Sequence, residues 1–255
     1  MLSLKFLCVF PLLSLPLHAA AVCDPNQLQG PYGFQLSGAA SISGQSQPAT
    51  SIGRIVFDGQ GGISGYSSVM FAGFLLGNPV TGTYESRSDC TASWSLQDDS
   101  GAYQHFSGEV SAGGKRVQFR QTDPGGPQSG ILARTSDQCK SSDLRKRYEF
   151  RLYGSFTPML PGEAPATVDA KGDVQADSQG NFMLTLRDKP LAATEITVEV
   201  ESDCIVHLQL ALPAEGGETP APITLRGILV DDAKEILAIQ TDPGWMAAAH
   251  LVAPD

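Results

Sequence analysis

Residues 121–125 are Gln-Thr-Asp-Pro-Gly, and the same five residues return unchanged at 240–244. Working outward from this stretch, Ser-Asp-Cys at 88–90 returns at 202–204. Two further matches pair Asp-Gly-Gln-Gly at 58–61 with Asp-Ser-Gln-Gly at 177–180, and Tyr-Gly-Phe at 32–34 with Tyr-Glu-Phe at 148–150. Since the matches keep their order along the chain, the sequence is an internal duplication.

The duplication and the N-terminus together predict three segments. Residues 1–21 have the composition of a secretory signal peptide, with Lys5 before an apolar stretch and alanines at 19–21 as the cleavage site. Division of the remainder before Cys139 gives one unit at 22–138 and a second at 139–255. No later segment reaches the roughly 18 uninterrupted apolar residues of a membrane helix. We therefore expect an exported protein (periplasmic or extracellular) with no transmembrane segment.

Each unit carries one cysteine near its start and another near its middle: Cys23 and Cys90, then Cys139 and Cys204. An even number of cysteines in an exported chain predicts disulfides, and four cysteines allow three pairings. Duplication favours Cys23–Cys90 and Cys139–Cys204, because an ancestral single unit would have closed the same bridge within itself. A lipid-modified Cys23 is the alternative for the first of these, but Val22 is an unsuitable residue before a lipidated cysteine.

Alternation of apolar and polar residues with a period of two appears in both units. Tyr32, Phe34 and Leu36 alternate with smaller or polar residues, as do Ile196, Val198 and others in the second unit. Turn signals separate seven or eight such strands per unit. The sequence therefore predicts an all-β protein of two tandem antiparallel up-and-down barrels, with β-sandwiches as the alternative. The barrel is favoured because closure removes exposed strand edges.

A family resemblance supports the barrel. The pattern Gly-Thr-Tyr-(x)4-Asp-Cys-Thr at 82–91, followed by the motif at 121–125, resembles that of uncharacterised exported bacterial proteins with lipocalin-like (calycin-type) barrel repeats. The resemblance covers most of the first unit and is weaker in the second, where Val198 stands in place of the tyrosine. It implies a barrel and export, and it implies no reaction.

The charge and the motifs of the chain argue against several classes of function. The chain has 27 acidic and 17 basic residues, a formal charge of −10, and no long basic run. Nucleic acid is therefore not an expected partner. The sequence contains no G-x-S-x-G elbow, no phosphate-binding loop and no close Cys/His spacing, so neither a cofactor nor a metal is predicted.

Three sequence features have both a structural and a functional interpretation. The repeated Asp-Pro-Gly favours a turn over an active-site loop, although Asp123 and Asp242 are placed alike. The segment 58–61 favours a hairpin turn over a calcium loop, because further acidic ligands are missing. His105 and His207 have no repeated partner, and we interpret both as surface residues.

The two predicted interiors differ in chemistry. The second unit directs mostly aliphatic residues inward, which suits a filled core: Val174, Ile196, Val198, Leu208, Leu210, Leu225 and Ile236. The first unit directs rings and glycines inward, and aromatic groups can line a pocket. The candidate ligand-binding residues are Tyr32, Phe34, Phe57, Tyr84, Trp94, Phe106, Phe119 and Gln121. A core filled by these rings is the alternative.

The sequence thus predicts a non-catalytic barrel protein that binds a small apolar or amphipathic ligand or acts as an interaction module. The alternative is a cofactor-free barrel isomerase or cyclase, which would use polar groups such as Tyr32, Tyr84, Ser86 and Gln121 inside the barrel. A structural or adhesive role is the third class. Ligand identity and oligomeric state are not encoded in any pattern that we find.

Overall fold

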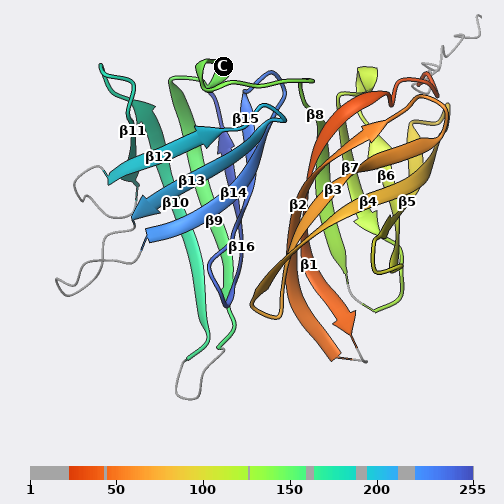
Figure 1. Ribbon diagram of the computed structural model, residues 1–255, viewed down its shortest axis with the longest axis horizontal. Helices are drawn as coiled ribbons and strands as arrows, with labels where there is room; N and C mark the ends of the chain where they lie inside the picture. Colours follow the sequence, from red (N-terminus) through yellow and green to blue (C-terminus); the bar gives the residue numbers. More distant parts are fainter. Residues whose placement is uncertain are drawn as a thin grey trace, which may run out of the picture.

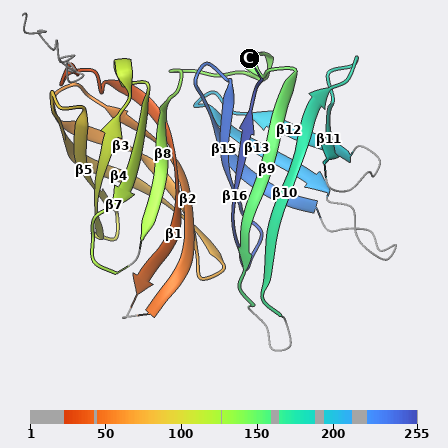
Figure 2. The ribbon, with the colours of Figure 1, turned by 180° about the vertical axis from the view of Figure 1, so that it is seen from behind.

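The computed structural model describes residues 23–42, 45–125, 127–158, 164–187, 194–211 and 222–254. It is an all-β protein of two closed antiparallel barrels with eight strands each (Figures 1 and 2). The predicted fold class is confirmed, and closure by the β1–β8 and β9–β16 ladders replaces the sandwich alternative. The predicted signal peptide at 1–21 lies outside the described residues.

The first barrel follows the chain strand by strand: β1 (Gly30–Ile42), β2 (Gln45–Phe57), β3 (Gly62–Phe71), β4 (Phe74–Ser86), β5 (Thr91–Asp98), β6 (Tyr103–Val110), β7 (Arg116–Gln121) and β8 (Gln128–Arg134). The second repeats this order: β9 (Arg147–Phe156), β10 (Ala166–Ala176), β11 (Phe182–Leu186), β12 (Thr194–Val200), β13 (Ile205–Ala211), β14 (Pro222–Val230), β15 (Glu235–Gln240) and β16 (Trp245–Val252). Short 3₁₀ turns occur at Ala112–Gly114 and Ser141–Asp143. No helix in the described part of the chain is long and apolar enough to cross a membrane.

The repeated aspartates at 58 and 177 make the same hairpin turn in both barrels. Asp58 Oδ1 accepts hydrogen bonds from the backbone N–H groups of Gln60 and Gly62. Asp177 Oδ1 does the same, accepting from residues 179 and 181. Such bonds are typical of Asx turns, so this segment has the hairpin role that its sequence favours.

Each barrel has one end closed by the segment that precedes its first strand, and β1 and β9 both start at the top of Figure 1. In the first barrel Leu28 is fully buried beneath the strands, and its carbonyl accepts a hydrogen bond from the Tyr84 hydroxyl at 2.9 Å. The Tyr32 hydroxyl donates to the Gly114 carbonyl, and the equivalent Tyr148 hydroxyl donates to the Ala233 carbonyl. In each barrel, the equivalent tyrosine therefore makes a hydrogen bond that stabilises the closed end of that barrel.

Both predicted disulfides, Cys23–Cys90 and Cys139–Cys204, are present. Each connects the closing segment to the turn after the fourth strand of its own barrel. Cys90 and Cys204 share a left-handed backbone conformation, with φ of 66° and 72°. The bridges thus occupy equivalent positions, as a duplicated unit requires.

The two barrels pack together through an apolar face that is continuous with the hydrophobic core of the second barrel. On the first barrel this face includes Ile52 and Met70, both almost fully buried, and it belongs to the same cluster as Ile228, Leu237 and Ile239. All six residues of β15 are buried, because one face fills the second barrel and the other covers the first. Glycine at position 33 permits this close approach, since a Cβ there would lie 2.7 Å from Val230 Cγ1.

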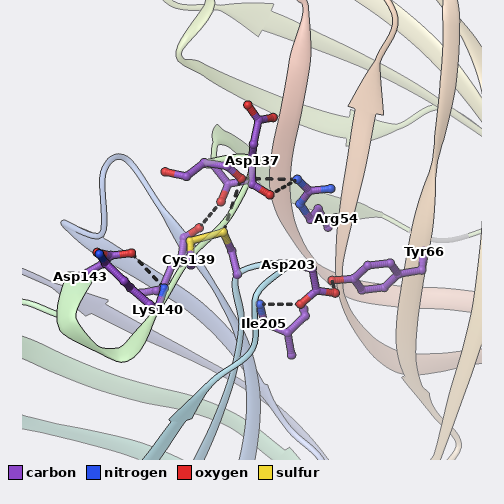
Figure 3. The surroundings of a disulfide bond; sticks show 12 residues. Arg54, Tyr66, Asp137, Cys139, Lys140, Asp143, Asp203 and Ile205 are labelled. Carbon is purple, nitrogen blue, oxygen red and sulfur yellow. Dashed lines mark hydrogen bonds between the residues drawn. A yellow bond between two sulfur atoms is a disulfide. The ribbon is translucent and has the colours of Figure 1, made fainter.

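Polar contacts surround the apolar face near the Cys139–Cys204 bridge (Figure 3). The Tyr66 hydroxyl of β3 donates to the Asp203 carboxylate of the second barrel. Arg54 of β2 donates to the carbonyls of Ser136 and Asp137 in the connection between the barrels. The disulfide of the second barrel therefore lies at the junction of the two halves.

A buried carboxylate links the barrels electrostatically. Glu235 of β15 accepts two hydrogen bonds from the Arg116 guanidinium of β7, at 2.5 and 3.0 Å, and also bonds the His250 ring. Burial alone would raise the pKa of this carboxyl, but His250 and Arg116 together lower it to about 2. The ionised Glu235 is consequently favoured by folding and docking.

This interaction predicts an acid-dependent loss of stability. Because the folded-state pKa of Glu235 lies below the ordinary value of 4.5, its contribution is complete above pH 4.5 and disappears as the pH falls towards 2. We expect Glu235→Gln to lower the free energy of unfolding at pH 7 by about 3 kcal/mol. Urea unfolding at a series of pH values should show wild type and variant converging near pH 2. A constant difference between them across this range would contradict the prediction.

Candidate ligand-binding cavity

Three rings on consecutive strands form a cluster inside the first barrel. Trp94 of β5 stacks on Phe106 of β6 with centroids 5.6 Å apart, and Phe119 of β7 meets both rings edge to face at 5.0 and 5.5 Å. The alternating burial of β5 and β6 turns every second residue inward, which brings the rings together. All three side chains are almost fully buried.

The ring of Phe34, on β1, faces the same interior. A Cβ at Gly53 on the neighbouring β2 would lie 2.4 Å from Phe34 Cε1, so this position needs glycine for the ring to fit. Glycine and ring therefore complement each other across the two strands. At this position the glycine is explained by the ring opposite it.

A cavity of about 80 Å³ lies among these rings. Its apolar wall includes Phe34, Leu36, Ile55, Val80, Trp94, Leu96, Phe106, Phe119 and Leu132. Polar residues also line it: Ser51, Ser67, Asn78, Asp98 and Gln104. Since Asp98 and Gln104 flank the β5–β6 hairpin, opposite the closed end, these two residues mark the open rim of the barrel.

The structure separates the eight candidate binding residues into groups. Phe34, Trp94, Phe106 and Phe119 line the cavity. Tyr32, Phe57 and Tyr84 form a second edge-to-face cluster at the closed end, with centroids 5.3 and 4.8 Å apart, and are not among the lining residues. Gln121 is hydrogen-bonded to Asp123 and Gln128 and also lies outside the lining.

The polar residues of the rim were missed by the sequence reasoning, although a signal for them exists. Val80 faces inward on β4. Asn78 lies two residues before it and Asp98 pairs with it across β4 and β5, so both residues lie on the same inward face. Gln104 pairs with the inward Leu96 across β5 and β6. Extending each alternating pattern to the end of its strand would have identified these residues as inward-facing.

The interior of the second barrel is mostly aliphatic. Leu208, the repeat counterpart of Trp94, is 2% exposed and lies opposite Val198 and Leu225 on the adjacent strands. Val174, Ile196, Leu210 and Ile236 are buried in the same cluster, and Val198 packs against it half-buried. Aliphatic Leu208 and Leu225 therefore replace the rings of Trp94 and Phe106, whereas Tyr148 and Phe150 keep the rings of Tyr32 and Phe34.

The repeated motif at 121–125 and 240–244 forms the same hydrogen-bonded turn in both barrels. Asp123 accepts hydrogen bonds from the His105 backbone N–H and the Gln121 amide. Asp242 accepts the same two bonds, from the Thr224 backbone and the Gln240 amide. Each motif thus fastens one turn to the start of a neighbouring strand, as expected of a turn rather than an active-site loop.

Neither His105 nor His207 is among the residues that line the cavity. His105 is exposed and its ring bonds Asp123, and the half-exposed His207 ring bonds Glu201. Among the described residues, no group of three His, Cys, Asp or Glu side chains is arranged to hold a metal ion. The cavity in the first barrel is accordingly the feature on which a function can be argued.

Comparison with known proteins leaves the family open. No family model matches the chain, and a search of curated proteins finds no match. Solved structures that resemble it include transferrin binding protein B of Neisseria meningitidis (TM-score 0.31, 8% identity, covering 89% of this chain and 76% of that chain). A DUF3598-family protein of unknown function from Nostoc punctiforme has a TM-score of 0.24 and 9% identity, covering 88% of this chain and 95% of that chain. The Myxococcus xanthus hemagglutinin has a TM-score of 0.16 and 11% identity, covering 86% of this chain and 99% of that chain. Similarities this weak carry no inference about function.

Proposed function

We propose that the protein is an exported, non-catalytic binding protein that holds a small apolar or amphipathic ligand in its first barrel. The observation that carries the proposal is the cavity among Phe34, Trp94, Phe106 and Phe119, apolar within and polar at its rim. A concave apolar site with a few polar groups is the usual form of a small-molecule site. The second barrel, whose interior is mostly aliphatic, acts as a packed scaffold.

Two observations support export. The leader-like composition of residues 1–21 is typical of secreted proteins. Both Cys23–Cys90 and Cys139–Cys204 are disulfides, which form and persist mainly in oxidising compartments. Together they favour a periplasmic or extracellular location.

The polar groups that the sequence offers to a barrel isomerase or cyclase, Tyr32, Tyr84, Ser86 and Gln121, do not line the cavity. A barrel isomerase or cyclase would need polar side chains directed at its substrate. The Tyr32 and Tyr84 hydroxyls instead donate to backbone carbonyls at the closed end, and burial raises the pKa of both. Gln121 is engaged with Asp123, away from the cavity lining.

Removal of the central ring should abolish binding. A thermal-shift screen of small amphiphiles would first identify a stabilising ligand, and native mass spectrometry of the purified protein would show any ligand that accompanies it. We expect Trp94→Ala to lose the ligand-dependent rise in melting temperature, measured from the variant's own baseline, because the ring forms one wall of the cavity.

Leu208→Ala, at the equivalent position of the second barrel, is the matched control and should keep the ligand-dependent rise. If Leu208→Ala loses the response while Trp94→Ala retains it, the site has been assigned to the wrong barrel. If no ligand in the screen stabilises the wild type, a structural or adhesive role replaces the binding role.

A further inference from the structure

The rim of the cavity carries a single charge. Asp98, the last residue of β5, is the only charged residue lining the cavity in the described part of the chain. The other polar lining residues are neutral: Ser51, Ser67, Asn78 and Gln104. A ligand that enters here therefore meets one carboxylate and no cationic side chain.

The Asp98 carboxylate is held in place by its own hairpin. Its Oδ1 accepts hydrogen bonds from the backbone N–H groups of Ser100 and Ala102, at 2.9 and 3.2 Å, and from the Ser100 hydroxyl at 2.5 Å. Within the described residues, these bonds all reach Oδ1. The second oxygen is left able to accept a hydrogen bond from a ligand, in an orientation that the turn has already fixed.

Resting on the proposed function, we infer that the ligand is a small amphipathic amine, bound with its protonated nitrogen at Asp98 and its apolar end among the rings. A charge-assisted hydrogen bond to a carboxylate is stronger than one between neutral groups. The formal charge of −10 also attracts cations and repels anions such as fatty acids. The rim therefore selects an amine over a carboxylic acid of the same shape.

The enclosed volume limits the shape of the apolar end. At about 80 Å³ the cavity is smaller than the engineered cavity of about 150 Å³ that binds benzene. The end of a slender alkyl chain suits this space better than a ring system, and the carbons nearer the polar group then lie in the open rim. Its polar end then remains at the open rim, where Asp98, Asn78 and Gln104 lie.

Three probes with one alkyl chain test the inference: hexylamine, hexanol and hexanoate. Binding is followed by the chemical shift of the Trp94 indole N–H in ¹⁵N-labelled protein, with Trp245→Phe removing the second indole. We expect hexylamine to bind about tenfold more tightly than hexanol, since one charged hydrogen bond is worth at least this factor. Hexanoate should bind most weakly.

The variant Asp98→Asn keeps an oxygen that can accept the turn hydrogen bonds, so the hairpin should remain folded. It should weaken hexylamine about tenfold and leave hexanol unchanged. Asp99→Asn, at the exposed neighbour that does not line the cavity, is the matched control and should change neither affinity.

The outcomes separate the two proposals. Equal affinities for amine and alcohol, or an equal loss in Asp98→Asn and Asp99→Asn, would overturn the amine inference while leaving a binding cavity. Tighter binding of hexanoate than of hexylamine would overturn it as well. If none of the probes shifts the Trp94 resonance, both the amine inference and the first-barrel binding site fail.

Discussion

Opening the Cys139–Cys204 bridge by a double substitution to alanine is expected to lower the free energy of unfolding by about 4 kcal/mol. The bridge spans 65 residues of sequence, and closing a loop of this length removes much conformational entropy from the unfolded chain. Alanine is chosen because Cys204 is completely buried, and a serine there would add an unneeded polar group. Urea unfolding of oxidised wild type and variant measures the difference.

The Cys23–Cys90 bridge provides the internal control, because its span of 67 residues predicts nearly the same loss of stability. A larger loss at Cys139–Cys204 would measure its added role at the junction, where Arg54 and Tyr66 of the first barrel contact neighbouring residues. Losses below about 1 kcal/mol at both sites would contradict the chain-entropy explanation. Peptide mapping without reduction, linking the same pairs of cysteines, establishes the starting state.

Leu208→Ala is expected to lower the free energy of unfolding by about 2–5 kcal/mol. Leu208 lies in the buried cluster of the second barrel, where its neighbours across the sheet are Val198 and Leu225. Truncation removes the transfer energy of the lost carbons and leaves a void, because closed barrel walls can collapse only in part. Chemical denaturation followed by circular dichroism measures this effect.

Leu76→Ala makes the same chemical change on an exposed strand and serves as its control. Leu76 is 51% exposed on β4, so its truncation should change stability by no more than about 0.5 kcal/mol. A similarly small effect of Leu208→Ala would mean that the second barrel is not a filled core. That result would also remove the contrast on which the choice of the first barrel rests.

The repeat and the alternating patterns were sufficient to predict the barrels and the two disulfides. Strand faces are a local property: Trp94 and Leu96 share a face of β5 whatever surrounds them, because side chains alternate along any strand. Because the two units are equivalent, a strand assigned in one unit also predicts its counterpart in the other. The favoured cysteine pairs follow from this equivalence, and the hairpins at Asp58 and Asp177 follow from local turn chemistry.

Position along the barrel axis was not predictable in this way. Tyr84 and Trp94 lie side by side on β4 and β5 and both were candidate binding residues, yet only Trp94 lines the cavity. Tyr84 reaches the carbonyl of Leu28, which belongs to the closing segment. The alternating pattern predicts that a side chain points into the barrel. Its position along the barrel axis depends on strand register and on the segment that closes the barrel.

The amino-acid sequence by itself determined the duplication, the barrel class, the cysteine pairs and the chemistry of each interior, because all of these follow from local period and from comparison of the two halves. Only the tertiary structure decided which rings surround a cavity and which outer faces are covered. The Gln35 amide donates to the carbonyls of Ala238 and Ala249, residues more than 200 positions away, and Ile228 and Leu237 pack against the first barrel. No periodicity within one strand encodes such contacts, since they depend on how two finished surfaces fit together.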